Sequence, residues 1–179
     1  LLWLGVPIAK CELDLWIFQE IIFAVKPDII IECGTSHGGN TLFLASLCDL
    51  MGNGRVISID IKSEECRPEH KRIAYLHGSS TSVKIIEKVG SLIKKEDKVM
   101  VDLDSDHSKE HVINELRIYS KLVTKGSYLI VEDTCINGHP VYPGFGPGPM
   151  EAVEEFLKGN KDFIADISRE KLYLTFNPK

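Results

Sequence analysis

Apolar residues fall into segments of two kinds along this chain. Short, nearly continuous apolar runs are typical of strands that are buried on both faces of a parallel sheet. Five such runs predict strands at residues 29–33, 56–60, 73–76, 99–103 and 128–131. Longer segments place apolar residues at helical spacing. They predict helices at residues 13–24, 41–50, 83–93, 109–122 and 151–157. The alternation predicts an α/β fold with a doubly wound, mostly parallel, Rossmann-like sheet.

The C-terminal part follows a different pattern. Two apolar runs at residues 163–167 and 172–176 are separated by a connection short enough for a hairpin, so one late strand should run antiparallel. The predicted sheet then has about seven strands. Residues 140–149 are rich in proline and glycine and cannot hold regular structure. This segment is either a lid over a site or a plain connector to the last helix.

Composition limits the class of protein. With 179 residues, 44% of them hydrophobic, the chain suits a single domain spanning residues 1–179, with a core that needs no disulfide or structural metal. The formal charge is -5 and no Lys/Arg-rich block is present, which argues against nucleic acid as a partner. The composition leaves the oligomeric state open, so a homo-oligomer is compatible with it.

Cysteine usage and hydropathy bear on the compartment. The five cysteines are odd in number, scattered and never in a C-x-x-C pair, which argues against a disulfide framework or a zinc site and predicts a cytoplasmic protein. No apolar run approaches the roughly 20 residues that span a bilayer, so no membrane partner is expected. The chain begins with Leu1 rather than Met, and we expect that residues upstream are missing.

Two of the expected strands end in acidic clusters. Residues 99–103 lead into Asp104, Ser105 and Asp106, and residues 128–131 lead into Glu132 and Asp133. In open α/β sheets the crevice beyond the carboxyl ends of the strands binds ligands, so both clusters should face one cavity. Crowded carboxylates repel one another unless a positive charge lies between them. A ligand set made only of oxygen favours a hard divalent ion such as Mg²⁺.

A glycine-rich turn follows the first expected strand. Its candidate cofactor-binding residues are Glu32, Gly34, Thr35, Ser36, Gly38 and Gly39. The spacing matches neither the dinucleotide fingerprint nor the P-loop. An acid at the mouth of this turn would repel a pyrophosphate and favour a ligand with a sulfonium group, such as S-adenosylmethionine.

Two further positions fit a nucleoside. Asp60 ends the second expected strand, from which a carboxylate can bond the ribose hydroxyls of either NAD or S-adenosylmethionine; a surface-turn role is the alternative. Gly78, Ser79 and Ser80 either line an adenine pocket or cap the next helix. Asp104 should border the same cofactor.

The combined motifs resemble the cephalosporin hydroxylase family, which includes rhamnosyl O-methyltransferases. That family shares the class I methyltransferase fold with the catechol and caffeoyl-CoA O-methyltransferases. The resemblance covers nearly the whole chain, including the opening Trp3-Leu4-Gly5-Val6-Pro7 and the loop Phe145-Gly146-Pro147-Gly148-Pro149. The residues that carry it are Glu32, Gly34, Gly38, Gly39, Asp60, Asp104, Ser105, Asp106, His107, Glu132, Asp133 and Thr134.

The resemblance implies roles for individual residues. Asp104, Glu132 and Asp133 match the metal ligands of the catechol-type enzymes, where the last two are an Asp-Asn pair. His107 stands where those enzymes place a lysine that removes the hydroxyl proton, and a histidine suits this task near neutral pH. Its alternative is local hydrogen bonding at a helix start. Asn137 matches a substrate contact of the caffeoyl-CoA enzymes.

The resulting hypothesis is an S-adenosylmethionine-dependent, metal-assisted O-methyltransferase. Its acceptor would be a hydroxyl of a small molecule, a sugar or another natural product. The catalytic residues would be His107 and Asp104. Two other hypotheses compete: an NAD(P)-dependent oxidoreductase, which Asp60 permits and Glu32 disfavours, and a non-catalytic relic that keeps only the cofactor pocket.

Overall fold

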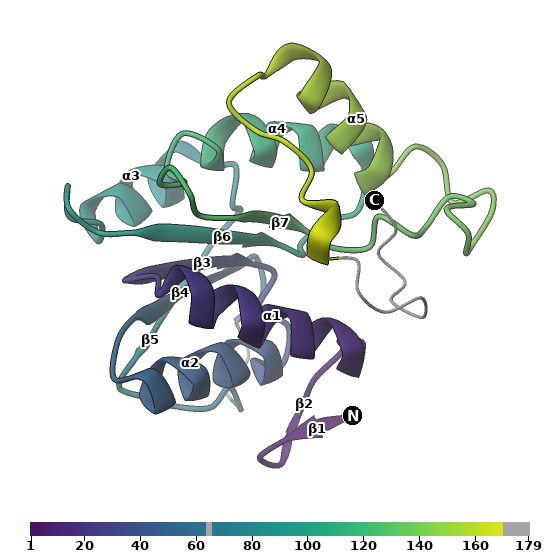
Figure 1. Cartoon of the computed structure of the whole chain (residues 1–179). Coiled ribbons are helices and arrows are strands. Elements are labelled where there is room, and N and C mark those ends of the chain that lie inside the picture. Colours follow the sequence, from purple (N-terminus) through teal and green to yellow (C-terminus); the bar gives the residue numbers. More distant parts are fainter. Residues whose placement is uncertain (64–65, 170–179) are drawn as a thin grey trace.

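A parallel sheet of five strands forms the centre of the computed structural model, which describes residues 1–63 and 66–169. The strands lie in the order β5-β4-β3-β6-β7 (Figure 1). Their bounds are β3 Ile29–Cys33, β4 Arg55–Asp60, β5 Ile73–His77, β6 Val99–Leu103 and β7 Leu129–Val131. The order reverses at β3, so the loops after β3 and β6 diverge and leave a crevice at the carboxyl ends.

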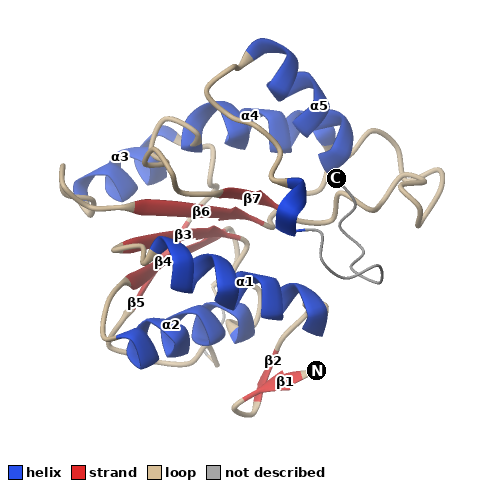
Figure 2. Ribbon diagram, in the orientation of Figure 1, coloured by secondary structure: helices blue, strands red, loops and turns tan. Residues whose placement is uncertain are grey.

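Helices cover both faces of this sheet, as the alternation predicts. Helices α1 (Glu12–Val25) and α2 (Gly39–Met51) lie on one face (Figure 2). Helices α3 (Val83–Ser91), α4 (Lys109–Tyr119) and α5 (Pro149–Gly159) lie on the other. Consecutive residues of β3 serve the two layers: Ile29 and Ile31 pack toward α4, and Ile30 packs toward α1 and α2. Burial on both faces is why the strand sequences are continuously apolar.

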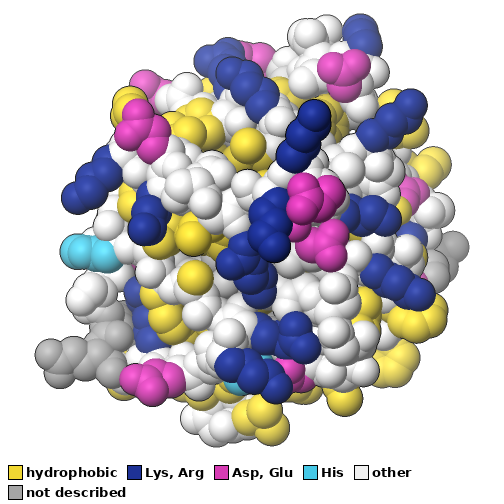
Figure 3. Space-filling view, turned by 90° about the vertical axis from the view of Figure 1, so that its left-hand side faces the viewer, with side chains coloured by type: hydrophobic (Ala, Val, Ile, Leu, Met, Phe, Trp, Pro, Cys, Tyr) yellow, Lys and Arg dark blue, Asp and Glu magenta, His cyan; other side chains and the backbone are white. Residues whose placement is uncertain are grey.

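The surface carries charged and apolar side chains together. Figure 3 shows lysine and arginine side chains beside acidic ones, with apolar side chains between them, on the face that it presents. Among the described residues, no helix combines the length and the apolar composition that crossing a bilayer requires.

A short N-terminal hairpin was not predicted. Strands β1 (Leu2–Trp3) and β2 (Val6–Pro7) pair antiparallel, and two residues are too few to show a period of two. The hairpin is fixed on α2, because the Trp3 ring meets the Phe43 ring edge-on at 4.9 Å between centroids. The Trp3 indole nitrogen also donates a hydrogen bond to Ser46 Oγ at 3.2 Å. This docking places the segment before α1 at the carboxyl ends of the strands.

The prediction of a strand at residues 163–167, the first strand of the expected C-terminal hairpin, is wrong. Residues 163–166 belong to no helix or strand, and Ile167–Arg169 forms a 3₁₀ turn. Asp166 accepts hydrogen bonds from the backbone and hydroxyl of Ser168, so local side-chain bonding replaces a ladder. The second predicted strand, residues 172–176, lies outside the described residues. The described sheet therefore has five parallel strands rather than about seven with an antiparallel hairpin.

Candidate active site

A cavity of about 590 Å³ opens at the carboxyl ends of the strands. Loops after β3, β4, β5 and β6 line it. The predicted cofactor residues in this lining are Gly34, Ser36, Asp60, Gly78, Ser79, Ser80 and Asp104. Gly34 is required by close packing, because a Cβ there would lie 1.9 Å from the carbonyl oxygen of Asp104. The sequence therefore located this cavity, although it missed the contributions of His37, Lys62, Ser105 and His111.

Asp60 is held rigidly at the cavity wall. Its Oδ2 accepts a hydrogen bond from the Ser36 backbone N–H at 2.8 Å, and its Oδ1 accepts one from the Lys62 N–H at 2.8 Å. Arg67 Nη2 lies 3.1 Å from Oδ2 and forms an ion pair with it. Each carboxylate oxygen has a second lone pair, so these bonds leave capacity for ligand hydroxyls.

Four predicted cofactor residues do not line the cavity: Glu32, Thr35, Gly38 and Gly39. Glu32 is fully buried, because residue 32 shares the strand face of Ile30 and points toward α2. Its carboxylate accepts hydrogen bonds from Asn40 at 2.8 Å and from Thr41 and Ser58 at 2.5 Å each. Burial raises its pKa despite these donors. Glu32 ties β3 to β4 and to the start of α2 in this structure, and its contact with a ligand stays a prediction.

The other members of this turn also have packing roles. Thr35 Oγ1 lies 2.6 Å from Ser58 Oγ in a buried hydrogen bond. Gly38 precedes α2 with φ of 84°, a left-handed conformation that favours glycine. A Cβ on Gly39 would lie 2.2 Å from the Pro7 carbonyl oxygen, so this glycine lets the N-terminal hairpin contact α2.

The two acidic clusters converge, as predicted, but a lysine lies among them. Lys10 Nζ is 2.8 Å from Asp104 Oδ2, 3.2 Å from Glu132 Oε1 and 3.8 Å from Asp102 Oδ2. The side chain of Lys10 is only 4% exposed. Burial alone lowers its pKa, yet the charges of Asp102, Glu132 and Asp104 together raise it well above the ordinary value. Lys10 thus supplies part of the positive charge that the sequence led us to expect from a metal ion.

Sequence reasoning missed Lys10 because the segment before α1 has no periodic pattern. Only the packing of the N-terminal hairpin on α2 brings this lysine to the strand ends. A possible signal was the net charge of the clusters, since buried carboxylates are normally paired with cations.

His107 contacts Asp104 as Lys10 does, through the other carboxylate oxygen, and also contacts Asp133. Its Nε2 is 3.3 Å from Asp104 Oδ1 and 3.1 Å from Asp133 Oδ2. The hydrogen bond with Asp104 raises the pKa of His107; burial opposes this, and the charge of Asp133 adds to it. Ligand atoms of Asp104, His107 and Asp133 lie within 4.8 Å of one another, a spacing that could hold a metal ion. Two of the predicted ligands, Asp104 and Asp133, belong to this group.

The third predicted ligand, Glu132, faces Lys10 instead. Burial raises its pKa to about 7, although Lys10 counteracts the shift. A cavity of about 240 Å³ adjoins these residues and shares Asp104 with the cofactor cavity. Its lining includes Lys10, Cys11 and Asp14 in addition to Glu132 and Asp133. The two cavities therefore meet at Asp104.

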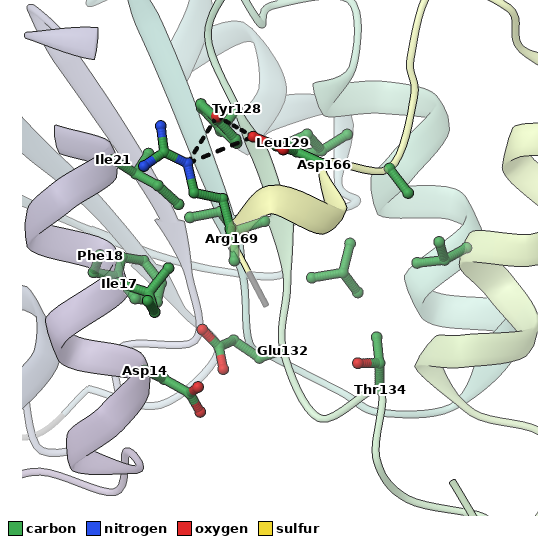
Figure 4. A pocket seen from close by; sticks show the side chains of 14 residues that line it. Asp14, Ile17, Phe18, Ile21, Tyr128, Leu129, Glu132, Thr134, Asp166 and Arg169 are labelled. Atoms are coloured by element: carbon green, nitrogen blue, oxygen red, sulfur yellow. Dashed lines mark hydrogen bonds and ion pairs between the residues drawn. The ribbon is translucent and has the colours of Figure 1, made fainter. Parts of the chain in front are cut away.

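An apolar groove of about 230 Å³ continues from this second cavity, with which it shares Asp14 and Glu132. Figure 4 shows the carboxyl groups of these two residues pointing toward one another at one end of the groove. Ile17, Phe18 and Ile21 of α1 form one wall. Tyr128 and Arg169 close the other end through a hydrogen bond of 3.1 Å.

Asn137, predicted to contact substrate, holds a loop in this structure. Its Nδ2 donates to Glu151 Oε1 at 2.8 Å, and its Oδ1 accepts from the Gly146 N–H at 3.1 Å. These bonds fasten residues 140–149 to the start of α5. Asn137 lines none of the three cavities. A substrate contact and a lid function for this loop both stay predictions.

Comparison with known proteins identifies the family. The family model described as "Rhamnosyl O-methyltransferase/CmcI" matches residues 1–179. The chain belongs to this family. It is 37% identical over 177 residues to the rhamnosyl O-methyltransferase of Mycobacterium leprae, covering 96% of this chain and 77% of the relative. It is 36% identical over 178 residues to the rhamnosyl O-methyltransferase of Mycobacterium tuberculosis, covering 96% of this chain and 72% of that relative.

Solved structures agree with the fold. A chain titled "cmcI-D160 Mg-SAM" matches with a TM-score of 0.67 at 20% identity, over 89% of this chain and 65% of that one. A putative caffeoyl-CoA O-methyltransferase from Staphylococcus aureus matches with a TM-score of 0.60 at 19% identity, over 86% and 75%. The expected family and class I methyltransferase fold are therefore confirmed. The relatives also confirm the expected class of enzyme, an S-adenosylmethionine-dependent O-methyltransferase.

Proposed function

We propose that this protein methylates a hydroxyl group of a sugar or another small natural product with the help of a divalent cation. The observation that carries the proposal is that two cavities meet at Asp104, one suited to a nucleoside and one bordered by the acidic cluster. The named relatives are rhamnosyl O-methyltransferases, which supports a sugar hydroxyl as acceptor. S-adenosylmethionine would supply the methyl group from the larger cavity.

The donor set fits a divalent cation. Asp104 and Asp133 present carboxylate oxygens to the same point, and the ligand atoms of these two residues and His107 lie within 4.8 Å of one another. Oxygen ligands suit Mg²⁺, and an added imidazole is compatible with Mn²⁺. Asp104 and Asp133 would hold the ion. Glu132, the third ligand that the sequence predicts, faces Lys10 in this structure. Such an ion would lower the pKa of the acceptor hydroxyl.

His107 is assigned the role of the general base that takes the proton from the acceptor hydroxyl. Its Nε2 lies between Asp104 and Asp133, which orient the ring and stabilise the imidazolium that forms after proton transfer. Asp60 would bond the ribose, and the fixed turn at Gly34 and Ser36 would align the cofactor with the acceptor. Much of the rate enhancement would come from this alignment of the two reactants. The alternative for His107 is a third metal ligand, which the geometry also permits.

A calorimetric and kinetic comparison of wild type with His107→Ala tests these roles. Binding of S-adenosylhomocysteine and of Mg²⁺ would be measured by titration, with NAD⁺ as the competing nucleotide. Methyl transfer from labelled S-adenosylmethionine would be followed on a panel of rhamnosides and other hydroxylated acceptors, with and without chelator. We expect binding of S-adenosylhomocysteine but not NAD⁺, and chelator-sensitive transfer. H107A should lower turnover by about 10²–10⁴-fold, with cofactor affinity and Mg²⁺ affinity preserved.

The outcomes separate the assignments. Loss of Mg²⁺ affinity in H107A would make His107 a ligand rather than the base. An equal loss of turnover and cofactor affinity would contradict both roles. A wild-type protein that binds NAD⁺ and not S-adenosylhomocysteine would overturn the proposed function.

A further inference from the structure

One wall of the cofactor cavity carries a buried polar network that the mechanism does not use. Ser80, from the loop after β5, and Ser105, from the loop after β6, both line this wall together with His111 of α4. Behind them lies Glu115, one helical turn after His111 and fully buried. A carboxylate that is buried behind a cavity costs free energy unless hydrogen bonds or a positive charge compensate it.

Glu115 accepts the protons of both serines. Ser80 Oγ donates to Glu115 Oε1 at 2.5 Å, and Ser105 Oγ donates to the same oxygen at 2.7 Å. His111 Nε2 lies 3.3 Å from this oxygen and 3.2 Å from Ser80 Oγ. A serine hydroxyl has one proton and two lone pairs. With the proton committed to Glu115, each serine oxygen can only accept a hydrogen bond from the cavity.

Helix α4 also fixes the position of these oxygens. Tyr119, one turn beyond Glu115, is fully buried and donates its hydroxyl proton to the Ser80 carbonyl at 2.8 Å. Behind Ser80, Gly78 has φ of 153° and lies against Ile85, where a Cβ would come within 2.8 Å of the side chain. The backbone of Ser80 is therefore held in place before a ligand arrives, and the bond to Glu115 orients Ser105, which reduces the entropic cost of binding.

The location of this wall indicates the part of the ligand that meets it. Asp60 marks the ribose, and Asp104 marks the side that faces the acidic cluster. The rest of the cavity is lined by the loops after β5 and β6, which would face the base of an adenosyl group. The inference therefore rests on the proposed function. Adenine carries an exocyclic amino group that donates hydrogen bonds, whereas hypoxanthine carries a carbonyl oxygen at the same position, which would place one acceptor against the serine oxygens, themselves acceptors.

We propose that Glu115 is a positioning residue that makes Ser80 and Ser105 obligate acceptors, so that this wall selects a 6-aminopurine over a 6-oxopurine. The selection does not require Glu115 to touch the ligand. It acts through the direction of two hydroxyl protons. A site that leaves a buried polar group unpaired against the wrong ligand discriminates more strongly than one that only loses a contact.

Isothermal titration with S-adenosylhomocysteine and S-inosylhomocysteine tests this inference in the full chain. Wild type should bind the adenosyl compound about tenfold to hundredfold more tightly. In Glu115→Gln, an amide whose Nε2 takes the place of Oε1 donates to the serines, whose protons can then turn toward the cavity. The ratio of the two affinities should fall to about threefold or less. Glu110→Gln, an exposed position on the same helix, serves as the matched control and should keep the wild-type ratio.

Ser80→Ala and Ser105→Ala keep the inference testable if E115Q fails to fold, because each removes one acceptor and keeps the carboxylate. At least one of them should lower the ratio. Equal affinity of wild type for both ligands, or an equal loss of both affinities in E115Q, would overturn the inference while leaving the proposed function intact. Unchanged ratios in both serine variants would also overturn it. Failure of wild type to bind S-adenosylhomocysteine would overturn the proposed function and this inference with it.

Discussion

Replacement of Lys10 by methionine would remove the positive charge from the acidic cluster and keep most of the side-chain volume. Lys10 Nζ lies within 3.8 Å of Asp102, Asp104 and Glu132, and none of these side chains is more than 21% exposed. Methionine restores the packing of the aliphatic stem but leaves three carboxyl groups without their cation. The variant therefore isolates the electrostatic role of Lys10 from its packing role.

The size of the effect follows from burial. Breaking a buried ion pair by removing one partner costs about 3–5 kcal/mol, because the remaining charge is left uncompensated. For a chain of this length each kcal/mol shifts the melting temperature by about 2–4 °C. K10M should therefore melt roughly 6–20 °C below wild type at pH 8.

The pH dependence gives a second and independent signature. Burial raises the pKa of Glu132 to about 7 and that of Asp102 well above its ordinary value. An acid whose pKa is raised by folding binds more protons in the native state, so its ionisation costs stability as pH rises from its ordinary value through the raised one. Without Lys10 these pKa values rise further. The deficit of K10M should therefore be largest at pH 8 and shrink toward pH 5.

Thermal and urea denaturation of wild type and K10M at pH 5 and pH 8, without divalent cations, measures both signatures. Lys95→Met, at an exposed position, is the matched control and should change stability by no more than about 0.5 kcal/mol. A loss in K10M below about 1 kcal/mol at pH 8 would refute the ion-pair reasoning. A larger loss that is the same at both pH values would show that Lys10 acts through packing instead of charge.

Two further variants test the wall of the cofactor cavity and the anchoring of the loop at residues 140–149. Gly34→Ala places a Cβ 1.9 Å from the Asp104 carbonyl at φ of 101°, so it should cost about 3 kcal/mol or more and weaken binding of S-adenosylhomocysteine; Gly90→Ala, with open space around it, should not lower the melting temperature. Burial alone raises the pKa of Glu151, but hydrogen bonds from His139, Gly148 and Asn137 lower it to about 2. Its stabilising effect is then present above about pH 4.5 and lost as pH falls through 2, so Glu151→Gln should melt below wild type at pH 7, keep part of this deficit at pH 3 and match wild type only at pH 2 or below; a constant difference would contradict this.

The strands were predictable because one physical cause determines their sequences. β3 and β6 occupy the centre of the sheet with helices on both faces, so every side chain is buried and the runs are apolar apart from Glu32 and Asp102. The predicted bounds of both strands agree with the structure at residues 29–33 and 99–103. The run at residues 163–167 is also apolar, but composition alone could not show that Asp166 and Ser168 bond locally and prevent strand pairing.

Site residues were harder to predict where the direction of the side chain depends on tertiary contacts. Asp104 and Asp60 follow strand ends, and every residue there lies near the crevice, so position along the chain was sufficient. Glu32 lies only one residue before the end of β3, yet strand alternation turns it toward α2, so it does not line the cavity. Lys10 could not be placed at all, because its position depends on how Trp3 docks the N-terminal hairpin on α2.

The charge balance of the cluster changes the argument for a metal ion without removing it. Asp102, Asp104, Glu132 and Asp133 are four carboxyl groups, and Lys10 compensates one of them. A protonated His107 compensates another, which leaves two negative charges when all the acids are ionised. Two protons on the buried acids, or one divalent cation beside Asp104 and Asp133, would neutralise the remainder. Binding of a divalent cation should therefore displace protons, and its affinity should rise with pH as Glu132 and Asp102 ionise.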